Sequence, residues 1–289
     1  MNCTVIENST GEIITENFNI DTIEDVVRKK QRAEKAKIDK EFKSLQDEVL
    51  GNFVFFIFRN IYNLEEILGA EGLVKFIYMG TYVKNDMYLK LDNNLTYISK
   101  KKLQKLIKIK HSTKFNAFYN TLVENNLTIE DAKGIMINPS YFYRGYERDY
   151  KKITGNKLEE FTRIYTDTTR KLFENTESRK HKQLAIIYKL LPYISYKYNV
   201  ICQNVNEINS MELKPLVVSD VMKILGYDSS NITRFKKDFY GLEYEGKQIF
   251  MTIQKTPKYT ESIILVNPKV YYRGKDVEEL QFLITLFKL

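Results

Sequence analysis

Two short stretches of polar and basic residues carry side chains suited to contacting nucleic acid. The first is a predicted helix that opens at Ser112, and its outward face carries Ser, Thr, Lys and Asn. Asparagine can form paired hydrogen bonds with adenine, and the other three types reach bases or phosphates. The alternative is an ordinary solvated face. The candidate contacts are His111, Ser112, Thr113, Lys114, Asn116 and Asn120, preceded by the phosphate candidates Lys101, Lys105, Lys108 and Lys110.

The second stretch lies at the start of a helix that is predicted to run to about Tyr240, capped by Ser229 or Ser230. Arg234 is its best candidate for base recognition, because the guanidinium fork matches O6 and N7 of guanine. A β-hairpin that follows adds basic residues at its tip. The candidates here are Ser229, Ser230, Asn231, Thr233, Arg234, Lys236 and Lys237, with Lys255 and Lys258 from the hairpin.

The same order of elements surrounds both stretches. Apolar residues at three- and four-residue steps predict helices over 72–83, from Ser99 and from Ser112, followed by β-prone runs at 127–129 and 134–137. In the second region, a helix over 218–225 ends at Gly226, another runs to Tyr240, and strands are predicted at 247–253 and 261–266. Helices followed by a hairpin are the order of a winged helix-turn-helix, in which the second helix of the turn enters the major groove.

An internal repeat supports this organisation. Residues 135–145 and 264–274 align without gaps and share six identical positions, in the pattern Ile-x-x-Asn-Pro-x-x-x-Tyr-Arg-Gly. An apolar strand closes each hairpin, and Asn-Pro ends it because proline cannot continue the ladder. We therefore interpret the repeat mainly as a terminator of the hairpin. Its arginines, Arg144 and Arg273, could contact phosphate or cap a helix.

The helix-turn-helix followed by this string resembles the winged-helix replication initiators of Gram-positive plasmids and their phage relatives. Residues 73–145 carry the resemblance best, and Thr10-Gly11-Glu12-Ile13 is similar to the amino-terminal strands of that family. The chain departs from the family in having two such modules where many members have one. The resemblance implies origin binding, and transcriptional repression by the same fold is an alternative.

The predicted fold is mainly α with small β-hairpins, of the α+β class, with two tandem winged helix-turn-helix modules joined by helices. We expect a hairpin and a long helix over 1–50, the first module over 51–150, a linker helix over 151–178, and the second module with a carboxy-terminal helix over 179–289. The long helix, capped by Asp21, is interpreted as a packing or dimerisation arm. A DNA-tracking helix is less favoured because acids are interspersed with its bases.

Charge and composition agree with a nucleic-acid partner. The chain has 45 Lys and Arg against 37 Asp and Glu, a formal net charge of +8, and such an excess attracts polyanions. Only two cysteines and two histidines are present, and neither phosphate-binding glycine motif occurs. We expect no enzymatic activity, no metal and no cofactor. With no leader or membrane span recognised, we also expect a cytoplasmic location.

These observations predict a sequence-specific protein for double-stranded DNA, an origin-binding replication initiator by resemblance. A transcriptional regulator and a protein-interaction module without DNA binding are the alternatives. A homodimer is left open, as are contacts with the replication or transcription machinery.

Overall fold

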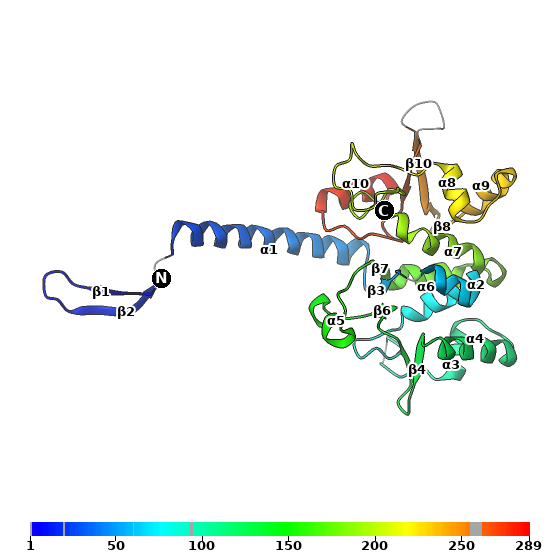
Figure 1. Ribbon diagram of the computed structural model, residues 1–289, viewed down its shortest axis with the longest axis horizontal. Coiled ribbons are helices and arrows are strands. Elements are labelled where there is room, and N and C mark those ends of the chain that lie inside the picture. Colours follow the sequence, from blue (N-terminus) through cyan, green and yellow to red (C-terminus); the bar gives the residue numbers. More distant parts are fainter. Residues whose placement is uncertain (1, 20, 60, 93–94, 255–261) are drawn as a thin grey trace. The chain divides into compact units, whose positions relative to one another are not determined.

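The amino-terminal residues form the hairpin and the long helix that the sequence predicts. In the computed structural model (Figure 1), β1 (Asn2–Ile6) pairs antiparallel with β2 (Ile13–Asn19). Gly11 in the connecting turn has a φ of 73°, a left-handed conformation that glycine adopts without steric cost. α1 then spans Ile23–Val49. The structure describes residues 2–19, 21–59, 61–92, 95–254 and 262–289.

The cap of α1 is one residue later than predicted. Thr22 Oγ1 accepts a hydrogen bond from the backbone N–H of Asp25 at 3.1 Å, and Asp25 Oδ2 accepts one from the N–H of Thr22 at 3.3 Å. This reciprocal pair satisfies two N–H groups that the first turn leaves unpaired. Asp21, the expected cap, instead forms an ion pair with Lys29 at 2.5 Å.

Residues 1–46 and 47–289 form two compact units. Helices and small antiparallel sheets make up the second unit and confirm the predicted α+β class. The helices are α2 (Ile61–Gly80), α3 (Lys100–Leu106), α4 (Ser112–Glu124), α5 (Glu147–Thr154), α6 (Thr166–Asn175), α7 (His181–Lys189), α8 (Val218–Ile224), α9 (Ile232–Tyr240) and α10 (Val277–Phe287), with 3-10 turns at Ser178–Lys180, Leu191–Tyr193 and Ser229–Asn231. The strands are β3 (Phe53–Ile57), β4 (Thr128–Glu130), β5 (Ile135–Ile137), β6 (Phe142–Tyr143), β7 (Phe161–Tyr165), β8 (Glu243–Tyr244), β9 (Lys247–Gln248), β10 (Phe250–Gln254) and β11 (Ser262–Val266).

A three-stranded sheet of order β6-β3-β7 lies at the centre of this unit. β3 runs antiparallel to β7, with Phe55 opposite Arg163 at the middle of the register. The prediction that residues 151–178 form a linker helix is wrong, because β7 lies between α5 and α6 in this range. Four of the five residues of Phe161–Tyr165 are aromatic or β-branched, which suits a strand. Its partner, however, lies more than a hundred residues earlier in the chain.

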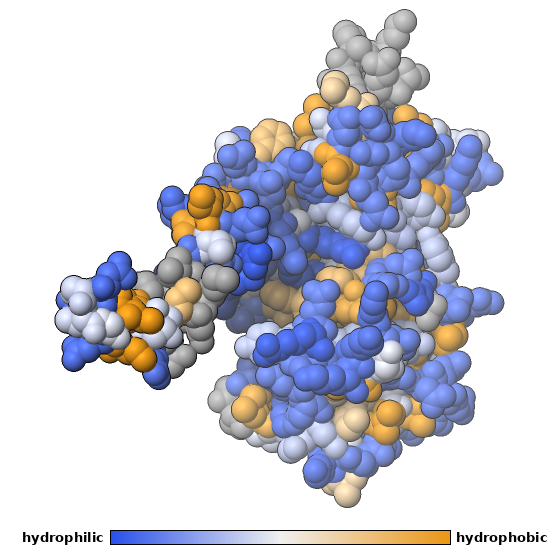
Figure 2. Space-filling view, turned by 60° about the vertical axis from the view of Figure 1, so that its left-hand side comes forward, coloured by the Kyte–Doolittle hydropathy of each residue, from blue (hydrophilic) through white to orange (hydrophobic). Residues whose placement is uncertain are grey.

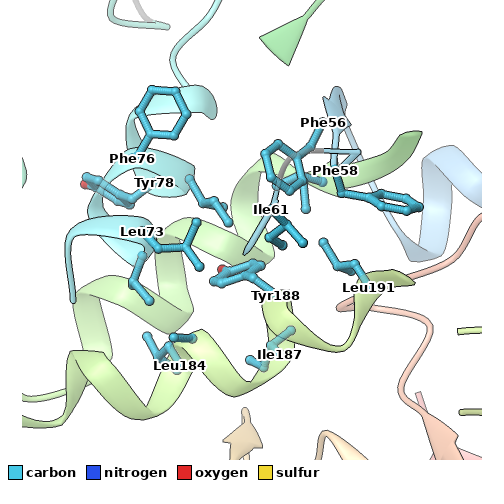
Figure 3. Packing of buried hydrophobic residues seen from close by; sticks show 14 of the residues in the cluster. Phe56, Phe58, Ile61, Leu73, Phe76, Tyr78, Leu184, Ile187, Tyr188 and Leu191 are labelled. Carbon is cyan, nitrogen blue, oxygen red and sulfur yellow. The ribbon is translucent and has the colours of Figure 1, made fainter. Parts of the chain in front are cut away.

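Helices α2 and α7 pack on each other beside the sheet. Figure 3 shows their apolar side chains meeting, with Leu73 of α2 above Leu184 of α7 and Ile61 above Tyr188. α4 packs on α2, and α9 packs on α7. In Figure 1, α2 and α7 therefore lie between α4 and α9.

The repeat extends well beyond its eleven residues. We name residues 70–145 the first copy and residues 181–274 the second copy. In the first copy the N–H of Leu89 donates to Ile135 O at 2.8 Å, and in the second the N–H of Ile201 donates to Ile264 O at 2.9 Å. In each copy a segment before the helix pair thus joins the last strand of the hairpin. The two copies share backbone connections that the sequence comparison did not contain.

The ends of the two copies also match in detail. Tyr143 Oη donates to Tyr146 O at 3.1 Å, and Tyr272 Oη donates to Asp276 O at 3.0 Å. A Cβ on the glycine that ends each motif would lie 2.5 Å from the hydroxyl of the tyrosine two residues before it. The Tyr-Arg-Gly string is therefore a folded unit in which only glycine fits.

Candidate nucleic-acid interface

α4 places the first set of predicted contact residues on the surface. Phe115, Tyr119 and Leu122 are buried, and the rings of Phe115 and Tyr119 stack with centroids 5.7 Å apart. Because these residues fix the inner face, the residues between them face outward. Each predicted residue of this set is exposed: Lys110, His111, Ser112, Thr113, Lys114, Asn116 and Asn120. Val123 of the same helix is 41% exposed, although its side chain is apolar.

α9 places the second set in the same way. Phe235 and Phe239 are fully buried, and their rings stack with centroids 5.0 Å apart. The predicted serine cap is wrong, because Asp228 Oδ1 accepts the hydrogen bond from the N–H of Ser230 at 2.8 Å. The described members of this set are exposed: Ser229, Ser230, Asn231, Thr233, Arg234, Lys236 and Lys237. Lys255 and Lys258 lie outside the described residues.

The lysines on and after α3 have different environments. Leu103 is buried, whereas Lys101 and Lys105 are exposed. Lys108 differs from them, because its Nζ donates to the backbone carbonyl oxygen of Glu174 at 2.7 Å and to that of Phe173 at 3.4 Å. These carbonyls belong to the last turn of α6, where a cation is favourable. Lys108 is therefore a cap of α6, a role that the sequence did not indicate.

Arg234 pairs with an acid through its Nε, while most of its side chain is exposed. Its Nε lies 3.7 Å from Asp238 Oδ2, and the Arg234 side chain is 70% exposed. Asp238 also accepts hydrogen bonds from Gln183 and from Tyr227, each at 2.9 Å. Burial and the bond to Asp238 raise the pKa of Tyr227 to about 12, so the phenol stays a donor. This network orients Arg234 while leaving its outer nitrogens accessible.

A hollow of about 740 Å³ lies between α7 and the turn that joins α8 to α9. Its lining includes the cations Lys180, Lys182, Lys189, Arg234 and Lys237 against the acids Glu65, Asp228 and Asp238. Lys189 is neutralised by Glu65 at 3.0 Å. Lys180 and Lys182 were not among the predicted contacts, because they precede or begin α7 rather than the helix that carries Arg234. Their position beside α9 comes only from the packing of α7 on α9.

The arginines of the repeat have buried surroundings. The guanidinium carbon of Arg273 lies 3.5 Å from the ring centroid of Tyr196 and 4.6 Å from that of Phe161. A cation between two rings is stabilised by their quadrupoles. Arg144 is partly buried, and burial lowers its pKa. Packing is therefore the better account of Arg273, in agreement with the interpretation of the repeat as a terminator.

The two copies meet at the central sheet, where β3 and β7 pair antiparallel. Phe53 lies opposite Tyr165, and Ile57 lies opposite Phe161. On the outer side of β3 lies β6, which ends the first copy. β7 likewise contacts the end of the second copy, since Arg163 Nη1 donates to Gly274 O at 3.1 Å. The antiparallel pair of β3 and β7 thus lies between the end of the first copy and the end of the second.

Candidate metal clusters and membrane-spanning helices are absent from the described part of the chain. It contains no group of three or more His, Cys, Asp or Glu residues that could hold a metal ion. Nor does any described helix have both the length and the apolar character needed to cross a bilayer. No protein-family model, curated protein or solved structure matches the chain.

Proposed function

We propose that the chain binds double-stranded DNA through two tandem winged-helix modules, with α4 and α9 as the helices that enter the major groove. The observation that carries this proposal is the duplication. Two copies of one folded unit each present a helix whose inner face is buried and whose outer face starts with Ser, Thr, Asn and Lys or Arg. These are residue types that read base edges.

The hairpins β4–β5 and β10–β11 are the wings of this arrangement. Lys101 and Lys105 on α3, with Lys182 and Lys237 around the hollow, supply phosphate contacts. Such contacts fix the register of a protein on the duplex and carry most of the salt-dependent affinity.

The presence of two reading helices in one chain defines the kind of site. Two such helices would read two adjacent major grooves, so the site has two halves. We therefore expect a repeated or pseudo-palindromic site with imperfect symmetry, because α4 and α9 differ in sequence. The half-sites should be centred roughly 10 base pairs apart.

Selection of bound duplexes from a random pool tests the proposal. An enriched motif with two halves supports it, and a motif with a single half contradicts the use of both helices. If the chain shows no salt-dependent binding to any duplex, the result favours the remaining class, a module that binds proteins.

For the biological role we propose origin recognition in the replication of a plasmid or phage, on the resemblance of the helix-turn-helix and the Asn-Pro string. The test is whether a plasmid that carries the gene and its flanking DNA replicates in a permissive host. Promoter occupancy without replication would instead identify a transcriptional regulator.

A further inference from the structure

α1 contains a basic segment that is exposed on every side. Residues 28–37, here called the basic segment, include six Lys or Arg residues and one acid. Every residue from Val26 to Glu41 is exposed. Figure 2 shows a largely hydrophilic surface along this helix. Within the ten residues of the basic segment no large apolar side chain is present, so burial of an apolar face does not account for this part of the helix.

Most cations of the basic segment have no counter-charge. Arg28 lies 3.9 Å from Asp25, and Lys29 pairs with Asp21. Within the described ranges, no ion pair involves the other four, which are Lys30, Arg32, Lys35 and Lys37.

The arrangement of these cations adds to their mutual repulsion. Arg28, Arg32 and Lys35 follow at steps of four and three residues and therefore share one face of α1. Like charges at this spacing destabilise an isolated helix. A polyanion that lies along the face of Arg28, Arg32 and Lys35 would relieve this repulsion and stabilise the helix.

We propose that the basic segment lies along the phosphate backbone of duplex DNA, as a contact additional to those of α4 and α9. This inference rests on the proposed function. A duplex carries about one negative charge per 1.7 Å of its axis. The seven residue-to-residue steps of helix from Arg28 to Lys35 span roughly 10 Å, so this face of the helix can lie along several phosphates. The contact is independent of sequence, because phosphates carry no base information.

A second copy of the chain fits the basic segment less well. Two basic segments placed side by side bring like charges together in either direction. Pairing of whole α1 helices in opposite directions would match the bases with Asp39, Glu41, Asp47 and Glu48. These acids are exposed, but Phe42 and Gln46 in the same part of the helix are only 7% and 6% exposed, so one face of it is already covered within the chain.

An anionic membrane also fits less well. A helix that lies on a lipid surface needs an apolar face to insert beneath the headgroups. The only apolar residues of the basic segment are Ala33 and Ala36. Their small side chains provide little area for insertion, so the charge of the segment is better matched by an aqueous polyanion.

The experiment compares two variants of the full chain, each of which removes two positive charges from α1. R32Q/K35Q alters the basic segment, and K40Q/K43Q alters the adjacent part, where acids alternate with the lysines. Glutamine has nearly the helix propensity of Lys and Arg, and circular dichroism checks that helix content is kept. Affinity for a long duplex of mixed sequence is measured between about 50 and 200 mM salt.

We expect R32Q/K35Q to reduce the slope of log affinity against log salt by about 2, and K40Q/K43Q to leave it unchanged. Equal slopes in both variants and the unmodified chain overturn the inference while the proposed function stands. If the unmodified chain binds no duplex, the proposed function and the inference both fall. If R32Q/K35Q leaves the slope unchanged but alters the sedimentation coefficient, the inference is overturned in favour of a second copy. If it leaves the slope unchanged but abolishes binding to phosphatidylserine vesicles, the inference is overturned in favour of a membrane.

Discussion

Asn138 and Asn267 occupy equivalent positions and make the same pair of hydrogen bonds. Asn138 Nδ2 donates to the carbonyl oxygen of Asn126 at 2.8 Å, and Asn267 Nδ2 donates to that of Gln248 at 3.1 Å. Each Oδ1 accepts from the backbone N–H two residues later, at 2.9 Å in the first copy and 3.0 Å in the second. The asparagine of the repeat thus joins the chain that enters the hairpin to the turn that leaves it.

The two asparagines should differ in what they contribute to stability. Asn267 is fully buried, whereas Asn138 is half-buried. N267A leaves a carbonyl and an N–H unpaired away from water, and we expect it to lower the free energy of unfolding by about 1–3 kcal/mol. Water can replace part of the bonds of Asn138, so N138A should cost less. Urea unfolding of both variants checks this order, and an equal or larger loss in N138A contradicts it.

Gly80 is expected to tolerate no side chain. A Cβ at this position would lie 2.3 Å from Cε1 of Phe142, a ring that also packs on Phe56 with centroids 4.9 Å apart. Because Phe142 is fully buried and cannot withdraw, G80A should destabilise the chain by about 1–3 kcal/mol or more. The cost should be smaller when measured in an F142L background. A cost that is the same in both backgrounds would remove the clash as its cause.

Stability should fall as the pH is lowered below about 6.5, the ordinary pKa of histidine. His181 is fully buried, its Nε2 lies 2.9 Å from Phe173 O, and its Nδ1 has no partner. Burial lowers its pKa in the folded state. The unfolded chain therefore binds a proton at His181 before the folded chain does, and acid favours unfolding.

Melting temperatures between pH 7.5 and pH 5 test this dependence. The comparison is made in an H111Q background, which leaves His181 as the sole histidine. Addition of H181Q should flatten the dependence in this range, above the region where carboxylates titrate. An unchanged slope after removal of His181 would show that another group is responsible.

Substitutions at Lys105 and Lys108 should have different effects, the first on DNA binding and the second on stability. Lys105 is exposed on α3, and K105A should reduce the salt slope of duplex binding by about 1. Lys108 caps α6 through Phe173 O and Glu174 O. K108A should therefore lower the melting temperature by about 2–4 °C, the shift expected for the loss of one net hydrogen bond. A K108A variant with unchanged melting and a reduced slope would assign Lys108 to the DNA contact instead.

Lys114 and Arg234 should each read one half of the site. Both are exposed at the starts of α4 and α9, in different copies of the repeat. K114A and R234A should each weaken binding to the selected duplex by about 1–3 kcal/mol, with relaxed base preference in one half only. Repeated selection with each variant measures this, and loss of preference in the same half for both would contradict the assignment.

The sequence by itself determined the local elements and the duplication. Helical periodicity located α3, α4, α8 and α9, and the Asn-Pro string marked the end of each hairpin. Such features depend on residues close together in the chain, where spacing and turn preferences act directly. The exposed starts of α4 and α9 followed from the same patterns, because the buried aromatics fix which face turns outward.

Only the tertiary structure decided how the two copies are joined. The pairing of β3 with β7 brings together residues more than a hundred positions apart, and the strand propensity of Phe161–Tyr165 is expressed only because that partner is present. The role of Lys108 as a cap of α6 and the position of Arg273 between two rings likewise depend on distant segments. Contacts of this kind are absent from local patterns, because they exist only once the core has brought the segments together.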